Sequence, residues 1–157
     1  MTEPGTEEST RAEVEEILDA IYGGYLAGAT NSIDVHLSER VTMFDSAAPD
    51  LVDGLADLAR LRAARAEHAD ADSGNVETAL TVHQLATRRL SDLVVATWWL
   101  RVDGTDASGE PVLPELSRNS AVFEPSPGGL VIAHLHEDVW QPLGGPLADR
   151  APGLSGA

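Results

Sequence analysis

The sequence ELSRNSAVFEPSPGGLVIAHLHEDVW, residues 115–140, decides the fold class of this chain. It holds two strand-like runs, 115–124 and 130–140, in which apolar residues alternate with polar ones over much of their length. Two prolines and two glycines lie among the five residues between the runs, which is typical of a turn. Strands joined by so short a connection pair as antiparallel neighbours, so this stretch predicts a β-hairpin.

Two further strand-like runs precede the hairpin, at residues 76–88 and 92–103. Their connections are short as well, because residues 89–91 join the two runs and residues 103–111 lead on to the hairpin. We therefore expect four long strands in antiparallel order.

Before residue 66 the apolar residues follow a helical period instead. The clearest example is one face of a helix that ends at Gly28, formed by Val14, Ile17, Leu18, Ile21 and Tyr25. The sequence then predicts a short helix that begins near Asn31, a short strand at 41–44, and a third helix over 53–65. Helices followed by antiparallel strands indicate an α+β fold, with three helices packed on one face of a curved sheet.

Length and composition exclude several classes of protein. The chain has 157 residues, a formal net charge of −16 and no Cys. This length suits a single domain, which we place at 11–140, between a disordered leader at 1–10 and a tail rich in Gly and Pro at 141–157. The negative charge argues against nucleic-acid and membrane partners, and the lack of Cys excludes disulfides. A polar N-terminus predicts a cytoplasmic protein.

This order of elements resembles the nuclear-transport-factor-2-like (NTF2-like) fold, the group that holds the ketosteroid isomerases and the SnoaL-type polyketide cyclases. The resemblance covers about residues 11–140. The resemblance rests on four features: the helix that ends at Gly28, the strand at 41–45, the Asp53-Gly54 start of the third helix, and the turn at 125–129 followed by Val131-Ile-Ala-His-Leu-His136. The resemblance implies a cone-shaped barrel with an internal pocket, and a homodimer formed through the outer face of the sheet.

The resemblance also implies roles for single residues. A general-base Asp of the ketosteroid isomerases matches Asp45, and a carboxylate at a pocket mouth can take a proton from a carbon beside a carbonyl. A cap of the following turn is the other interpretation of Asp45. The two oxyanion donors of the isomerases fall at Ile21 and near Asn119 or Ser120, which argues against steroid isomerisation itself. Tyr25 lies one helical turn after Ile21 on the same helix face, where it is either a hydrogen-bond donor or a core residue. We expect Asn119 to contact the substrate.

A second group of candidates lies along the last strand. Four residues at alternating positions share one predicted face with Ile132: His134, His136, Asp138 and Trp140. We expect that face to line the pocket, with His136 and Asp138 as catalytic groups and His134 and Trp140 as substrate contacts. A structural role for the histidines stays open, as does a metal held by both, although we expect none.

The opposite face of the last strand is apolar except for one charge, that of Glu137. Its other residues are Val131, Ala133, Leu135 and Val139. Because a solvated face would carry more charges, we expect this face to meet a partner subunit.

Arg118 and the Trp98–Trp99 pair complete the candidates. In one interpretation Arg118 binds a substrate carboxylate or orients Asp45. In the other it forms a salt bridge with an acidic residue at a strand edge. Adjacent Trp98 and Trp99 point to opposite faces, so we expect one, taken as Trp98, to contact substrate and the other to meet the partner. Core packing is the alternative for both.

Two functions fit these observations. The first is a small-molecule enzyme of the ketosteroid-isomerase or SnoaL-like kind, which isomerises, dehydrates or cyclises an apolar, carbonyl-bearing substrate without a cofactor. The second is a non-catalytic, dimeric ligand-binding or accessory domain. The same fold hosts both, so the fold does not decide between them.

Overall fold

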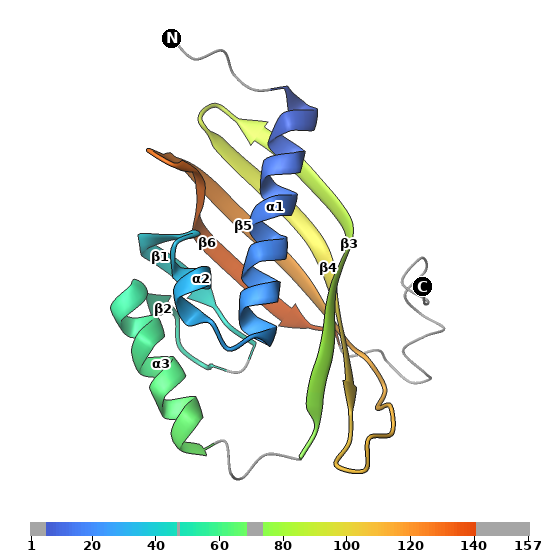
Figure 1. The fold of residues 1–157 in the computed structure, drawn as a ribbon. Helices are drawn as coiled ribbons and strands as arrows, with labels where there is room; N and C mark the ends of the chain where they lie inside the picture. The colour runs from blue at the N-terminus through green and yellow to red at the C-terminus, as the bar shows by residue number, and fades with distance from the viewer. Residues whose placement is uncertain (1–5, 47, 69–73, 141–157) are drawn as a thin grey trace.

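A computed structural model describes residues 6–46, 48–68 and 74–140 of the chain. Helix α1 (Glu7–Leu26) lies across one face of a curved sheet, with α2 (Thr30–Asp34) and α3 (Leu55–His68) to one side of it (Figure 1). The strands of the described residues are β1 (Leu37–Phe44), β2 (Val52–Asp53), β3 (Val76–Leu90), β4 (Leu93–Thr105), β5 (Glu115–Ser126) and β6 (Gly129–Val139).

These strands form one open sheet in the order β2-β1-β6-β5-β4-β3. Strand β1 runs parallel to β6, and every other neighbouring pair is antiparallel. The predicted α+β class is therefore confirmed, with helices followed by four long antiparallel strands. None of the helices in the described part of the chain is long and apolar enough to cross a membrane.

The first helix begins earlier than the sequence predicts. Residues 7–10 were assigned to a polar leader, but α1 starts at Glu7, where the Thr6 hydroxyl accepts a hydrogen bond from the Ser9 N–H at 3.1 Å. Gly28 follows the helix at a φ of +67°, a left-handed conformation that favours glycine, as predicted. Residues 1–5 and the predicted tail at 141–157 lie outside the described residues.

The segment between the helices differs from the prediction in two places. Strand β1 starts at Leu37 and not at residue 41, where the sequence predicts it. A two-residue strand, β2, pairs with β1 where only a helix cap was expected. Both elements are too short, or too irregular in register, to give a clear periodic pattern.

The core lies between α1 and the inner face of the sheet, which is the face that α1 covers. Val14, Ile17 and Leu18 of α1 are buried, which confirms the predicted helical face. They belong to one apolar cluster with side chains from every long strand, including Leu85, Val94, Trp98, Phe123 and Ile132. This cluster fixes which side of each strand points inward.

A β-bulge reverses the faces that the sequence predicts for β6. The register shifts so that Phe123 pairs with Ile132 but the next residue, Val122, pairs with His134. Ile132 therefore points into the core, while His134 and the residues alternating after it point to the outer face. The expected sharing of one face by Ile132 and the histidines is wrong, because one extra residue breaks the alternation.

Candidate functional site

After the bulge, the predicted candidate residues of β6 all lie on the outer face of the sheet. On the outer face lie His134, His136 and Asp138, with Trp140 directly after the strand. On the inner face lie Leu135, which packs against the core, and Glu137, which stands opposite the buried Asn119. The part of the predicted partner-facing side that follows the bulge, with Leu135 and Val139, thus points to the inner face of the sheet.

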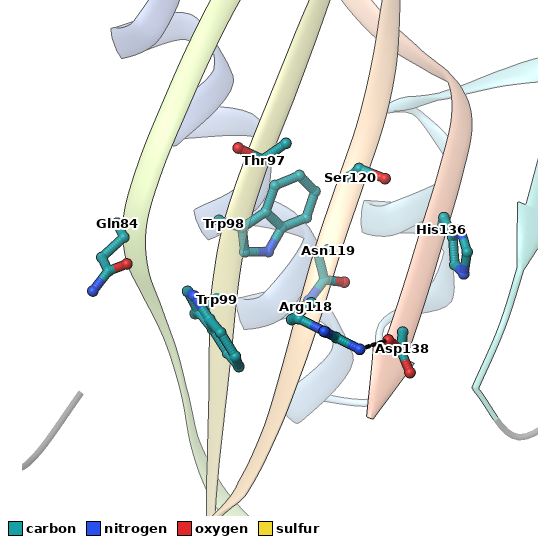
Figure 2. Close-up of a pocket in the computed structure, with 9 residues that line it drawn as sticks. All are labelled: Gln84, Thr97, Trp98, Trp99, Arg118, Asn119, Ser120, His136 and Asp138. Atoms are coloured by element: carbon teal, nitrogen blue, oxygen red, sulfur yellow. Dashed lines mark hydrogen bonds and ion pairs between the residues drawn. The ribbon is translucent and has the colours of Figure 1, made fainter. Parts of the chain in front are cut away.

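The outer face carries a shallow hollow of about 400 Å³. Arg118 of β5 and Asp138 of β6 lie side by side in it and form an ion pair, while His136 stands on the neighbouring rim (Figure 2). Trp99 and Gln84 close the opposite side. About half of each charged side chain of the ion pair is exposed, so this pair adds little to stability.

The other outer-face candidates are held by neighbours that suit a structural role. The Nδ1 atom of His134 lies 2.8 Å from the Thr42 hydroxyl oxygen, in a hydrogen bond with β1. His136 packs against the Phe44 ring, with ring centroids 5.5 Å apart. Trp140 meets Trp99 edge to face at 5.7 Å. Asp45 does not line this hollow, which is lined by Arg118 and His136.

Polar side chains of the inner face gather instead at the end of the cone where α1 stops. Glu137 is largely buried there, and its Oε1 accepts a hydrogen bond from the Ser46 hydroxyl at 2.8 Å. Asp45, beside Ser46, is mostly buried and forms an ion pair with Arg65 of α3. Burial raises the pKa of Glu137, and the charges of Asp45 and Glu115 raise it further, against the effect of the Ser46 hydrogen bond.

Two tyrosines of α1 border this group. The indole N–H of Trp98 donates to the Tyr22 hydroxyl oxygen at 2.9 Å, and Trp98 is only 3% exposed. Burial is also the main cause that raises the pKa of Tyr22, to which the Glu137 charge contributes. Tyr25 is half exposed, and burial together with the Glu77 carboxylate raises its pKa to about 12. Both phenols therefore stay protonated near neutral pH.

Asn119, on the inner face, has a buried side-chain atom without a hydrogen-bond partner among the described residues. It is 4% exposed and lies between Trp98 on β4 and Glu137 on β6. Its Nδ2 donates to the Ser117 hydroxyl at 2.9 Å, and its Oδ1 has no partner within the described residues. Turning the amide over would only exchange the atoms, so one polar atom stays unpaired in either orientation. A buried unpaired atom is costly, and a bound ligand would satisfy it.

The structure thus groups four of the predicted site residues on the inner face: Tyr25, Asp45, Trp98 and Asn119. It places the other five on the outer face: Arg118, His134, His136, Asp138 and Trp140. The prediction did not include Glu137, Tyr22 and Arg65 as site residues. One signal for Glu137 was present, because it is the single charge on an otherwise apolar side of β6.

The described residues do not contain a cluster of side chains that could bind a metal ion. No three His, Asp or Glu residues of the described segments are placed to hold a metal ion together. The alternative that His134 and His136 share a metal with Asp138 therefore has no preformed ligand set here.

No known protein family matches the chain, and no curated protein matches it. Solved structures do match. An NTF2-like protein of unknown function from Pseudomonas putida is 14% identical, covers 88% of this chain and 92% of its own, and has a TM-score of 0.65. A Catenulispora acidiphila protein in complex with S-DNPA is 16% identical over 84% of this chain and 94% of its own, with a TM-score of 0.65. The association domain of C. elegans CaMKII is 14% identical over 84% and 97%, with a TM-score of 0.64. The chain has the NTF2-like fold, as its element order predicts.

Proposed function

We propose that this protein is a small-molecule enzyme in which Glu137 transfers a proton inside the cone. The observation that carries the proposal is a largely buried carboxyl group, that of Glu137, which is paired across two strands with Asn119, a buried residue whose Oδ1 has no partner within the described residues. A carboxyl group in such a place has a pKa above its ordinary value, which brings it closer to neutral pH. General acid–base catalysis works best with a group of that kind.

The groups around Glu137 suit a substrate that carries a carbonyl. The unpaired amide atom of Asn119 and the protonated phenol of Tyr22 are available to hydrogen-bond polar atoms of the substrate. Asp45 and its partner Arg65 place one fixed charge of each sign beside the carboxyl group. The apolar side chains next to these groups on the inner face would hold the hydrocarbon part. The reaction class is isomerisation, dehydration or cyclisation.

In this proposal the outer-face residues take no part in proton transfer. His136 and Asp138 lie across the sheet from Glu137, and Asp138 is already paired with Arg118. Glu137 therefore replaces His136 and Asp138 as the proposed proton carrier, and Asp45 is retained as a group that sets the charge around it.

Deuterium exchange tests the proposal without knowledge of the natural substrate. A panel of cyclic and aryl ketones is incubated in D₂O with the wild type, Glu137→Gln or His136→Gln, and deuterium at the carbon beside the carbonyl is followed by NMR. We expect the wild type to accelerate exchange for part of the panel, Glu137→Gln to lose at least about 100-fold of that rate, and His136→Gln to keep it. Exchange at the buffer rate with wild type, or at an undiminished rate with Glu137→Gln, contradicts the proposal.

A non-catalytic ligand-binding domain is the second candidate, and one observation favours it. Trp98 is buried in the core cluster and is hydrogen-bonded to Tyr22, so its ring fills space that a large substrate would need. The Catenulispora protein, which has this fold, was solved in complex with S-DNPA, and that complex is consistent with a binding role. Binding of a compound without any deuterium exchange would support this candidate over the enzyme.

We further propose that the chain forms a homodimer through the outer face of its sheet. That face carries the Trp99 and Trp140 rings and the Phe44 ring, which is 45% exposed. One of the structures with this fold is named an association domain, which fits a role of the fold in assembly. Apolar rings on a sheet face are typical of surfaces that meet a partner.

A further inference from the structure

Ser46 reaches Glu137 because β1 and β6 are neighbours in the sheet. Strand β1 runs parallel to β6, with Phe44 opposite His136, so the chain that leaves β1 passes the end of β6. Two residues beyond Phe44, the exposed Ser46 donates a hydrogen bond from its hydroxyl to Oε1 of Glu137 at 2.8 Å. The two residues are 91 positions apart in the chain, so this contact depends on the fold and not on local sequence.

Two further contacts fix the chain around Ser46. The Ala48 N–H donates to the Asp45 carbonyl oxygen at 3.1 Å, which closes a turn. The Asp45 side chain is only 17% exposed and forms an ion pair with Arg65 of α3. A hydroxyl group whose neighbours are anchored loses less conformational freedom when it makes a hydrogen bond than one on a loose chain. Ser46 is therefore suited to hold a carboxyl group in one position.

The two carboxyl oxygens of Glu137 have different surroundings. Oε1 accepts the hydrogen bond from Ser46, whereas Oε2 forms no hydrogen bond with any of the described residues. Among those residues, the fully buried side-chain atoms without a partner are His83 Nε2 and Asn119 Oδ1, so Oε2 of Glu137 is not fully buried. Water or a ligand can therefore reach Oε2, while Oε1 is already occupied.

This difference decides which oxygen carries the proton. A carboxyl oxygen that takes up a proton becomes a donor, and it is then a poorer acceptor for the Ser46 hydroxyl. The hydrogen bond to Oε1 therefore favours protonation of Glu137 at Oε2. An acid–base group must also lie within hydrogen-bond reach of the atom that it serves. A carboxyl group that is fixed at one oxygen presents the other oxygen in a constant place.

We propose that Ser46 is a positioning residue: it holds Oε1 of Glu137, so that Oε2 exchanges the proton with the substrate. In the forward step the C–H bond beside the carbonyl breaks, its electron pair forms the C=C bond of an enolate, and the proton goes to Oε2. Return of that proton to carbon, or of a deuteron taken up from solvent, restores the ketone and the carboxylate. The transfer to substrate rests on the proposed function, whereas the hydrogen bond to Oε1 is a property of the protein alone.

The charges around Glu137 stay the same when only Ser46 is changed. The titratable and charged groups that act on Glu137 from the other elements are Asp45 after β1, Glu115 of β5, Arg65 of α3, and Tyr22 and Tyr25 of α1. Substitution of Ser46 keeps all of them. A changed titration of Glu137 in such a variant therefore reports the lost hydrogen bond.

Two substitutions of Ser46 separate positioning from a change in basicity. Ser46→Ala removes a hydrogen bond that lowers the pKa of Glu137, so the titration midpoint of Glu137 should rise. A stronger base that stayed in place would exchange deuterium faster, whereas a carboxyl group that is no longer held should exchange it more slowly. Ser46→Thr keeps the hydroxyl, and Ser32→Ala, which changes an exposed serine of α2, is the matched control.

Carbon-13 NMR measures the midpoint of Glu137 in each variant. Deuterium exchange of the ketone panel is then measured at a pH above all of these midpoints, where Glu137 is ionised in every variant. Because the Ser46 side chain is exposed, both of its variants should fold, which circular dichroism and thermal melting check.

We expect Ser46→Ala to have a raised midpoint and an exchange rate at least about tenfold below that of the wild type. Ser46→Thr and Ser32→Ala should keep both values near those of the wild type. An unchanged midpoint in Ser46→Ala, exchange at the wild-type rate or faster, or an equal loss in Ser46→Thr overturns the inference.

The Glu137→Gln variant separates this inference from the proposed function. If Glu137→Gln exchanges deuterium like the wild type, the catalytic proposal fails whatever the Ser46 variants do. If Glu137→Gln loses exchange while Ser46→Ala keeps the wild-type rate, the inference on Ser46 fails and the catalytic proposal stands.

Discussion

At the scale of single residues, Tyr22 and Trp98 separate the apolar core from the polar end of the cone. The Trp98 ring belongs to the core, whereas its N–H needs a partner that the apolar side chains cannot supply. Tyr22 supplies it, and the same phenol lies within reach of the Glu137 charge. The Tyr22 hydroxyl thus accepts the hydrogen bond of a core residue and also borders the candidate site.

Removal of that hydroxyl should destabilise the fold. In Tyr22→Phe the Trp98 N–H is left buried without an acceptor, which costs about 1–3 kcal/mol of unfolding free energy. Urea denaturation followed by Trp fluorescence measures the loss. Tyr25→Phe is the control, because Tyr25 is half exposed, and it should cost less than Tyr22→Phe. Equal losses in the two variants would show that the Trp98–Tyr22 hydrogen bond does not stabilise the fold.

Glu137 should make the stability of the wild type depend on pH. Its pKa in the folded chain is raised above the ordinary 4.5, so its protonated form favours the fold. That contribution is complete below about pH 4.5 and is lost as the pH rises through the raised pKa.

Glu137→Gln removes the charge but keeps an acceptor for Ser46, so it should be more stable than the wild type at pH 8, by an amount on the order of 1 kcal/mol. The difference should shrink towards pH 4. Chemical denaturation at several pH values measures it, with Glu16→Gln on exposed α1 as the control for loss of one charge. A pH-independent difference would contradict the burial of this charge.

At the scale of elements, the bulge in β6 limits what the sequence predicts. Periodic patterns gave the helix ending at Gly28 and the four long strands, because these depend on local spacing. The bulge at His134 depends on pairing with β5, which lies outside the pattern of β6 itself. A shift of one residue exchanges the two faces, so the class of fold was predicted correctly while His136 and Glu137 were placed on the wrong sides.

The same limit explains the divided candidate site. Asn119 lies on the inner face and its neighbour Arg118 on the outer face, whereas Asp45 and Tyr25 come from other elements and lie within electrostatic reach of Glu137. Arg65 comes from α3, and its pairing with Asp45 depends on how that helix docks, which no local pattern encodes. Residues that meet only through docking of distant elements could not be grouped from the sequence.

Glu13 links α1 to the β5–β6 hairpin, and its removal should weaken that contact. Its Oε1 accepts a hydrogen bond from the Leu130 N–H at 2.7 Å, and Leu130 is 9% exposed. Glu13→Ala leaves this buried N–H unpaired, with an expected loss of about 1–3 kcal/mol. Glu16→Ala, in the same helix but exposed, should change stability by less than about 0.5 kcal/mol. Thermal or urea unfolding compares the two, and similar losses would refute the role of the link.

At the scale of the whole molecule, the two faces of the sheet have different surroundings. The inner face is covered by α1 and holds the core, with the candidate site at its end (Figure 1). The outer face holds a shallow hollow and three aromatic rings that no helix of the described chain covers. In our proposals the chemistry takes place on the inner face and association uses the outer face.

The outer face should therefore mediate a dimer at micromolar concentration. Phe44→Glu adds a charge to that face and should yield monomers in sedimentation velocity runs. Val35→Glu, which replaces a side chain that is 68% exposed beside α2, should leave the dimer intact. Because each copy carries a net charge of −16, salt should tighten the dimer. A monomeric wild type, or equal effects of the two variants, would contradict this assignment.

The central claim, that Glu137 is a proton-transferring group inside the cone, is tested most directly by its own titration. Carbon-13 NMR follows the side-chain carboxyl signals of the labelled protein with pH, and the signal missing from Glu137→Gln identifies Glu137. The account predicts a midpoint for Glu137 above the ordinary 4.5, because burial and the neighbouring acids hold its proton. A midpoint at or below 4.5 would mean that this carboxyl group is ionised and solvated like a surface glutamate, and the proposed catalytic role would fall.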